Sequence, residues 1–254
     1  MNGLLAALMF FTRLPIHRVR RVPTESFRHV TGWWSITGWL TGGVSALTCW
    51  LMTELTTPAI AIVAALLVRA VLTGALHEDG LADFLDGMGG GNDRDSRLRI
   101  MKDSHIGTYG VIGLVMYFLL SFAILSSVRL SYVPIVIMTS DVLSKCVCSH
   151  IVWLLPYARQ ESESKSRTVY SLPTPLEETL TILSGITALL LLTVTCHSST
   201  VHWFIFSVVQ LSAIIVFVLL VLLCKRRIGG YTGDCCGALC LITELVFRFL
   251  TAVF

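Results

Sequence analysis

The sequence changes abruptly from apolar to acidic at residues 76–91, which read LHEDGLADFLDGMGGG. As a helix, this stretch places Asp79, Asp83 and Asp86 at positions i, i+4 and i+7, on one face. Like charges at this spacing repel each other. A divalent cation would offset the repulsion, and a carboxylate cluster without cysteine suits Mg²⁺ or Mn²⁺ better than Zn²⁺. The alternative is a solvated acidic loop between two membrane spans; the regular spacing favours the metal site.

The remainder of the chain is too apolar for an ordinary soluble domain. Only 14% of its 254 residues are charged, with a formal net charge of +3, whereas a soluble domain carries about a quarter. The mean hydropathy is +0.76. We therefore expect an all-α polytopic membrane protein that forms one domain over residues 1–254. The eight cysteines lack the spacing of a zinc or disulfide framework and are expected to be small buried side chains.

Seven apolar stretches approach the length of about 20 residues that crosses a bilayer. The expected spans are Trp33–Met52, Thr57–Leu76, Thr108–Val128, Tyr132–Leu155, Leu180–Cys196, Trp203–Leu223 and Cys236–Phe254. The stretch from Leu4 to Phe11 is too short to cross and is expected at the interface. About seven transmembrane helices are therefore expected.

Basic residues alternate between the expected loops, which predicts the orientation of the chain. They lie before the first span and after the second, fourth and sixth spans: Arg13, Arg18, Arg20, Arg21, Arg28; Arg94, Arg97, Arg99, Lys102; Arg159, Lys165, Arg167; Lys225, Arg226 and Arg227. Only Arg129 breaks the alternation. The pattern predicts a cytoplasmic N-terminus, an outer C-terminus and an active site at the cytoplasmic edge of the membrane.

Charged residues also occur inside the expected spans, where each is costly unless it is paired. Asp141 and Lys145 are four residues apart and form either a structural or a functional pair. Arg69 either extends to the interface or faces the acidic stretch, and the sequence leaves both open. We expect Glu244 to pair with the residue four positions later, Arg248.

Two further patterns are typical of phosphate chemistry. The glycine run 87–91 ends the acidic helix and lets backbone N–H groups approach a phosphate. Arg94, Arg97, Arg99 and Lys102 follow it closely, and an acidic face followed by a basic stretch suits a Mg²⁺–pyrophosphate substrate. Membrane topology explains any single basic residue equally well; the combination favours the phosphate site. Near the C-terminus, GGYTGDCCGA at residues 229–238 leads into the last span, with Thr232 or Asp234 as its helix cap.

These motifs resemble those of the cobalamin synthase family. The first motif runs from His77 to Gly90 and continues through Arg94, Arg97 and residues 100–110, IMKDSHIGTYG. The second covers residues 229–238 and Glu244. The segments Phe11–Pro15 and Pro156–Arg159 match as well. The resemblance spans nearly the whole chain in the same order.

The resemblance implies an adenosylcobinamide-GDP ribazoletransferase in the bacterial inner membrane. Such an enzyme joins adenosylcobinamide-GDP to α-ribazole or α-ribazole 5′-phosphate, releases GMP and uses Mg²⁺ as its cofactor. The expected partners are these two substrates and the lipid bilayer, with no nucleic acid, while the oligomeric state is left open.

The expected site residues fall into three groups. Asp79, Asp83 and Asp86 would bind the metal, and one of them or His77 would be the general base. The substrate-binding residues would be Arg94, Arg97, Lys102, Asp103 and Asp234, of which Asp234 either completes the metal site or orients the nucleotide.

Two other classes of membrane protein share some of these features. A CDP-alcohol phosphotransferase also uses a membrane-edge aspartate cluster and a metal, but its last two aspartates lie farther along the chain, whereas here three fall within eight residues. A cation transporter places its acids at the bilayer midplane, whereas these lie at an edge. Both patterns favour the transferase.

Overall fold

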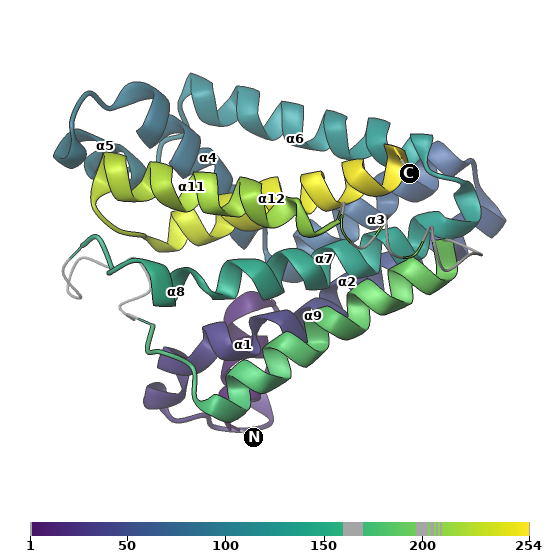
Figure 1. Ribbon diagram of the computed structural model, residues 1–254, viewed down its shortest axis with the longest axis horizontal. Coiled ribbons are helices and arrows are strands. Elements are labelled where there is room, and N and C mark those ends of the chain that lie inside the picture. Colours follow the sequence, from purple (N-terminus) through teal and green to yellow (C-terminus); the bar gives the residue numbers. More distant parts are fainter. Residues whose placement is uncertain are drawn as a thin grey trace.

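The computed structural model describes residues 2–159, 170–196 and 210–253, together with Trp203, Phe206 and Val208. Within these residues the only β pairing is an isolated bridge between Tyr157 and Tyr231. The long helices lie side by side along one axis (Figure 1). The predicted all-α class is confirmed. Two predicted regions lie outside the described residues. One is the loop that carries Lys165 and Arg167, and the other is most of the part of the expected sixth span that precedes Gln210.

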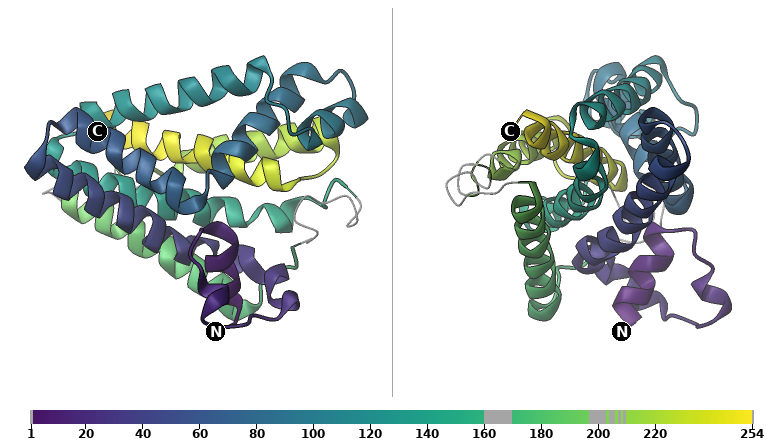
Figure 2. Two further views of the ribbon diagram at one scale, coloured as in Figure 1. Left: turned by 180° about the vertical axis from the view of Figure 1, so that it is seen from behind. Right: turned by 90° about the vertical axis from the view of Figure 1, so that its right-hand side faces the viewer.

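The helices follow the predicted apolar stretches closely. The α-helices are α1 Asn2–Phe11, α2 Trp34–Leu55, α3 Pro58–Thr73, α4 Leu76–Gly90, α5 Arg94–Lys102, α6 Thr108–Ser127, α7 Val133–Ser149, α8 Ile151–Leu154, α9 Pro175–Cys196, α11 Ala213–Ile228 and α12 Gly233–Val253; short 3₁₀ segments occur at η1 Ile16–Arg18, η2 Thr24–Trp33 and η3 Leu130–Tyr132. The short apolar helix α1 lies beside the beginning of α2 instead of among the long helices (Figure 2).

The described residues contain four helices that are long and apolar enough to cross a membrane, or five when the bent pair α3–α4 counts as one span. The four are Thr108–Ser127, Leu130–Leu154, Pro175–Cys196 and Gly233–Val253. The membrane class is therefore confirmed, but the expected number of seven is not. Helix α2 is long enough, with 22 residues, yet its face toward α7 is built of small residues: a Cβ on Gly38 would lie 2.9 Å from Cα of Val142. Small residues of this kind let two helix backbones approach closely.

A sharp bend separates the acidic stretch from the apolar helix before it. Helix α3 ends at Thr73, and Gly74 (φ 66°) and Ala75 (φ 56°) both adopt left-handed conformations, which are uncommon for a residue with a Cβ. The axes of α3 and α4 differ by 89°. Arg13 packs against Gly74 where a Cβ would collide, and its backbone N–H donates to the Leu72 carbonyl at 2.7 Å. The acidic stretch therefore forms a separate helix.

The bend brings α4 against the beginning of α12. A Cβ on Gly80 would lie 3.1 Å from the carbonyl oxygen of Asp234, and one on Gly237 would lie 3.0 Å from the carbonyl oxygen of His77. Two backbones can meet this closely only because both positions are glycine. Asp79 and Asp234, which are far apart in the sequence, consequently line one cavity.

Arg69 lies at the centre of a buried cluster of charges. Its Nη1 lies 2.6 Å from Oε2 of Glu244 and 3.6 Å from Oδ1 of Asp141. Its Nη2 lies 3.1 Å from Oε1 of Glu78 and 2.6 Å from the hydroxyl of Tyr117. The side chain is 4% exposed. Of the two predicted positions for Arg69, the structure therefore shows the one that faces the acids.

The same cluster contains the two pairs predicted from i, i+4 spacing. Lys145 Nζ lies 2.6 Å from Oδ2 of Asp141, and Arg248 pairs with Glu244. The expected Glu244–Arg248 pair is confirmed. We use the name charge cluster for Arg69, Glu78, Asp141, Lys145, Glu244 and Arg248, in which three acidic and three basic side chains balance.

Candidate active site

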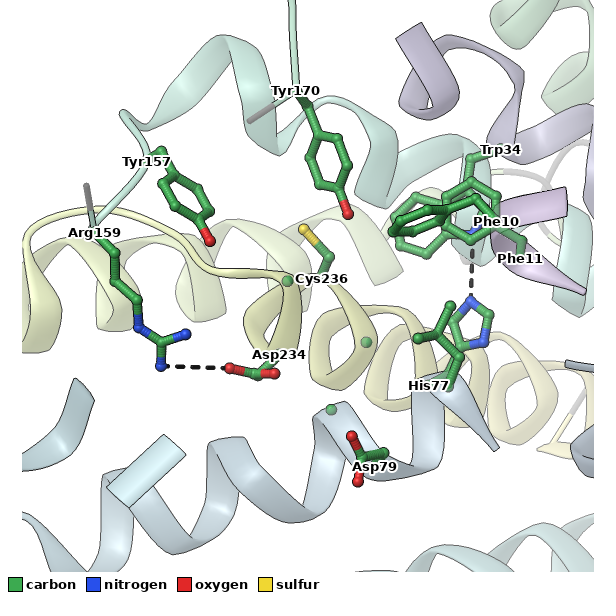
Figure 3. Close-up of a pocket in the computed structure, with 14 residues that line it drawn as sticks. Phe10, Phe11, Trp34, His77, Asp79, Tyr157, Arg159, Tyr170, Asp234 and Cys236 are labelled. Atoms are coloured by element: carbon green, nitrogen blue, oxygen red, sulfur yellow. Dashed lines mark hydrogen bonds and ion pairs between the residues drawn. The ribbon is translucent and has the colours of Figure 1, made fainter. Parts of the chain in front are cut away.

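An aromatic cavity opens where α1, α2, α4 and α12 meet the chain that follows α8 (Figure 3). Its empty space, including open solvent at the mouth, is about 690 Å³. Its walls are formed by Phe10, Phe11, Trp34, Leu76, His77, Asp79, Gly80, Tyr157, Arg159, Tyr170, Gly233, Asp234, Cys236 and Gly237. Five separate segments of the chain therefore contribute to one site.

Three stacked rings form one wall of the aromatic cavity. The Phe11 and Trp34 rings lie 5.1 Å apart and differ in orientation by 7°, and the Trp34 and His77 rings lie 5.7 Å apart. Trp34 Nε1 donates to Nε2 of His77 at 3.3 Å. Because Nε2 accepts this bond, the proton of a neutral His77 lies on Nδ1. The imidazole is thus held in one tautomer, and Nε2 is already occupied.

The opposite side of the cavity carries the charged groups. Asp79 is exposed on α4, and Asp234 lies on the first turn of α12. Arg159 Nη2 lies 3.7 Å from Oδ2 of Asp234 and donates to the carbonyl of Leu98 at 3.0 Å. The Arg159 side chain is only 4% exposed. A guanidinium held in this way supplies a fixed positive charge beside the carboxylates.

A second, cationic cavity adjoins the first and shares Arg159 with it. Its empty space, including open solvent at the mouth, is about 990 Å³, and it is lined by Arg94, Asp95, Leu98, Arg99, Lys102, Ala158 and Arg159. Arg94 also connects α5 to the chain after α8 and to the end of α11, because its Nη2 donates to Ala158 O at 2.7 Å and its Nε to Ile228 O at 3.1 Å. Four cations and one acid around a cavity favour an anionic ligand.

The predicted site residues divide between these cavities and other positions. His77, Asp79 and Asp234 line the aromatic cavity, and Arg94 and Lys102 line the cationic one. Asp83, Asp86, Arg97 and Asp103 line neither. Asp83 and Arg97 are buried, and Asp103 is an exposed residue whose pKa is lowered by its hydrogen bond with His105.

Asp86 has a partner that the acidic pattern did not predict. Its two carboxylate oxygens accept backbone N–H groups from Gly107 at 2.7 Å and Gly110 at 2.8 Å. Gly107 precedes the first residue of α6, so Asp86 caps that helix from α4. A Cβ on Gly110 would collide with the carboxylate. The repulsion expected along the acidic face is therefore offset at Asp86 by N–H groups and the α6 dipole.

We expect Asp86→Asn to lower the free energy of unfolding by about 1–2 kcal/mol, because the amide keeps one acceptor oxygen for two N–H groups and loses the charge that favours the helix N-terminus. Thermal unfolding in detergent measures the change. Asp95→Asn, an exposed aspartate on α5, is the matched control and should stay close to the wild type. Equal stability of Asp86→Asn and the control would contradict the capping role.

Several lining residues were not among the predicted site residues. Arg159 was attributed to membrane topology, and Arg99 belongs to the basic stretch predicted to suit a phosphate but was not named as a site residue. The aromatic walls were not singled out. A signal for some of them was present, since Phe11–Pro15 and Pro156–Arg159 belong to the segments that carry the family resemblance. For Trp34 and Tyr170 no local pattern distinguished a cavity wall from ordinary packing.

Known proteins match this chain over nearly its whole length. Residues 3–252 match the family model described as cobalamin-5-phosphate synthase. A protein of Shewanella baltica (strain OS185) named adenosylcobinamide-GDP ribazoletransferase is 33% identical, covering 98% of this chain and 93% of the relative. A protein of Shewanella pealeana with the same name is 34% identical and covers 100% and 95%. No solved structure matches the chain. The chain therefore belongs to the cobalamin-5-phosphate synthase family.

Proposed function

We propose that this membrane transferase joins adenosylcobinamide-GDP to α-ribazole, or to α-ribazole 5′-phosphate, and releases GMP. The observation that carries the proposal is the full-length match to the family and to relatives that bear the name of this activity. The two adjoining cavities support it, because one offers aromatic walls with carboxylates and the other offers positive charge.

In the reaction, a ribose hydroxyl of ribazole attacks the phosphorus that is bonded to the cobinamide arm. A new P–O bond forms to the ribose, and the bond from that phosphorus to the oxygen of GMP breaks, leaving the electron pair on GMP. Positioning and charge stabilisation dominate such displacements. We assign the proton of the attacking hydroxyl to Asp79, because its carboxylate is exposed and lines the aromatic cavity.

His77 is better suited to positioning than to accepting this proton. Its Nε2 accepts the Trp34 N–H at 3.3 Å, and the ring is stacked against the Trp34 indole. A base must be free to take the proton that it abstracts. We therefore propose that His77 holds the aromatic wall in place and fixes the beginning of α4, next to Asp79.

The cationic cavity would receive the pyrophosphate. Arg159 lies at its junction with the aromatic cavity, and Arg99 and Lys102 line it farther along. Negative charge develops on the phosphate of the leaving GMP, and fixed guanidinium and ammonium groups stabilise it. Arg94 contributes charge and also holds α5 against Ala158.

The carboxylates fit Mg²⁺ only in cooperation with the substrate. Among the described residues, no group of three or more His, Cys, Asp or Glu side chains is close enough to hold an ion by itself. Mg²⁺ is commonly held by one or two carboxylates together with substrate phosphates. We propose that Asp234, at the cavity wall, and Asp83, buried one turn after the Gly80 that meets the Asp234 backbone, would hold it, with Asp86 engaged at α6. The ion would neutralise the phosphate oxygens.

We propose that both cavities face the cytoplasm. The cavity at α5 is lined by basic residues, and the basic residues of the N-terminal segment and of the end of α11 follow the same positive-inside pattern. The nucleotide substrate would then reach the site from the aqueous side, while the helices remain in the bilayer.

The decisive experiment supplies the purified full chain, in nanodiscs, with adenosylcobinamide-GDP and α-ribazole. We expect GMP and the joined corrinoid in equal amounts, loss of both when EDTA removes Mg²⁺, and recovery when Mg²⁺ is added back. Release of CMP from a CDP-alcohol instead would favour a lipid phosphotransferase. Cation flux without any nucleotide product would favour a transporter. Turnover that EDTA leaves unchanged would remove Mg²⁺ from the proposal.

A further inference from the structure

We propose that the aromatic cavity binds the planar base of the incoming riboside and selects an apolar heterocycle over a purine such as guanine. The proposal rests on the function proposed above and assigns one substrate to one cavity. It follows from the rigidity of the walls, from the position of their polar groups and from the order of charges along the site.

The aromatic walls are held in place by contacts among themselves. Phe10 meets the Phe11 ring edge-on at 5.0 Å and the Tyr170 ring at 6.0 Å. Tyr170 in turn stacks with Tyr231, at 6.4 Å and an angle of 12°. Phe11 continues into the stack with Trp34. Rings that are already ordered lose little conformational freedom when a flat ligand enters, and any base has a face that can stack on them.

The aromatic end offers few hydrogen-bonding groups for the edges of a purine. An indole has one donor and no acceptor, and the Trp34 N–H already donates to His77. Phe10, Phe11 and Leu76 have no polar side-chain atom. Guanine carries donors and acceptors on its edges, and burying these without partners is unfavourable. The benzimidazole ring of ribazole carries one acceptor, its unsubstituted ring nitrogen, and otherwise apolar edges, so the penalty for burying it is smaller.

The remaining polar groups are arranged in the order that a riboside requires. In Figure 3 the hydroxyls of Tyr157 and Tyr170 point to the middle of the cavity, and Asp79, Asp234 and Arg159 follow away from the stacked rings. Burial raises the pKa of Tyr170 well above its usual range, so its hydroxyl keeps its proton. A base at the stacked rings would place its ribose at Asp79 and leave the phosphates to Arg159 and the cationic cavity.

The test compares Tyr170→Leu and Phe10→Leu with the wild type in nanodiscs. Both side chains are only partly buried, and two variants from different segments guard against the misfolding of one. We expect the KM for α-ribazole to rise about tenfold in each, the scale of losing one aromatic partner of a base. The kcat and the KM for adenosylcobinamide-GDP should stay within about twofold. Tyr132→Leu, in η3 outside the cavity, is the matched control.

A binding measurement without turnover provides the second readout. Titration of α-ribazole alone into each variant should show the same loss of affinity as the KM. Wild-type protein should also bind the benzimidazole riboside more tightly than the corresponding adenine riboside, and the two variants should lose most of that preference.

The outcomes separate this inference from the proposed function. A rise in the KM for adenosylcobinamide-GDP, with unchanged α-ribazole binding, would show that the cavity holds guanine and would overturn the assignment. Unchanged constants for both substrates in both variants would show that the cavity holds neither. In each case wild-type GMP release continues, whereas failure of the proposed function appears as no GMP release by the wild type.

Discussion

Replacing Asp79 with asparagine is expected to lower GMP release by at least about two orders of magnitude, the scale of removing a positioned general base. The amide has nearly the same size but cannot accept the proton of the attacking hydroxyl. Asp79 is exposed, and the structure assigns it no helix end to cap, unlike Asp86. The variant should therefore unfold at the wild-type temperature, so the loss would be chemical and not structural.

A Mg²⁺ titration distinguishes the proton acceptor from a metal ligand. With Asp79→Asn, kcat should fall while the Mg²⁺ concentration for half-maximal activity stays unchanged. With Asp83→Asn, the required Mg²⁺ concentration should rise. Glu54→Gln, an exposed acid near the end of α2, is the control. Normal turnover of Asp79→Asn would contradict its assignment, and a shifted Mg²⁺ requirement would make Asp79 a ligand.

Replacing Arg69 with methionine is expected to lower the free energy of unfolding by about 3–5 kcal/mol, as when one member of a buried ion pair is removed. Methionine fills much of the space, but Glu78 loses its guanidinium partner, and Glu244 keeps Arg248 as its one charged partner among the described residues, beside the Tyr117 hydroxyl that donates to it at 2.8 Å. A charge left unpaired inside a membrane-spanning bundle is costly. Equilibrium unfolding in detergent measures the effect.

The control for Arg69 is Arg129→Met, because Arg129 contacts Tyr132 beyond the end of α6 and lies outside the charge cluster. Its stability should remain close to that of the wild type. Adding Glu78→Gln to Arg69→Met removes an unpaired acid and should restore part of the loss, a coupling that a double-mutant cycle detects. Equal stability of the Arg69 and Arg129 variants would show that the cluster does not hold the bundle together.

Local pattern alone was sufficient for the features that depend on neighbours in the sequence. The apolar runs located α6 and α12 to within a few residues, and i, i+4 spacing gave the Glu244–Arg248 pair. A helix brings such residues together whatever surrounds it. The motifs at residues 77–110 and 229–238 likewise identified the family before any geometry was known.

The count of spans and the helix at residues 94–102 were less accessible. Helix α5 begins with a reciprocal cap, in which Ser96 N–H donates to Asp93 at 2.8 Å and Asp93 N–H to the Ser96 hydroxyl at 3.0 Å. The basic composition of this stretch is typical of a cytoplasmic loop, and the local signal for the helix is the pair Asp93 and Ser96. Helix α2 has the length of a membrane span, but it is not among the helices that are apolar enough to cross. The small residues with which it packs against α7 add little hydropathy.

Only the tertiary structure decided which distant groups meet. The left-handed turn at Gly74 and Ala75 directs α4 across to α12, and this bend sets Asp79 beside Asp234 and Asp86 beside the α6 N-terminus. The tertiary packing also decides that Arg69 faces Glu244 and not the membrane interface. Periodicity fixes the face of a helix on which a side chain lies, but the neighbour of that face depends on how helices far apart in the sequence pack, which local spacing does not encode.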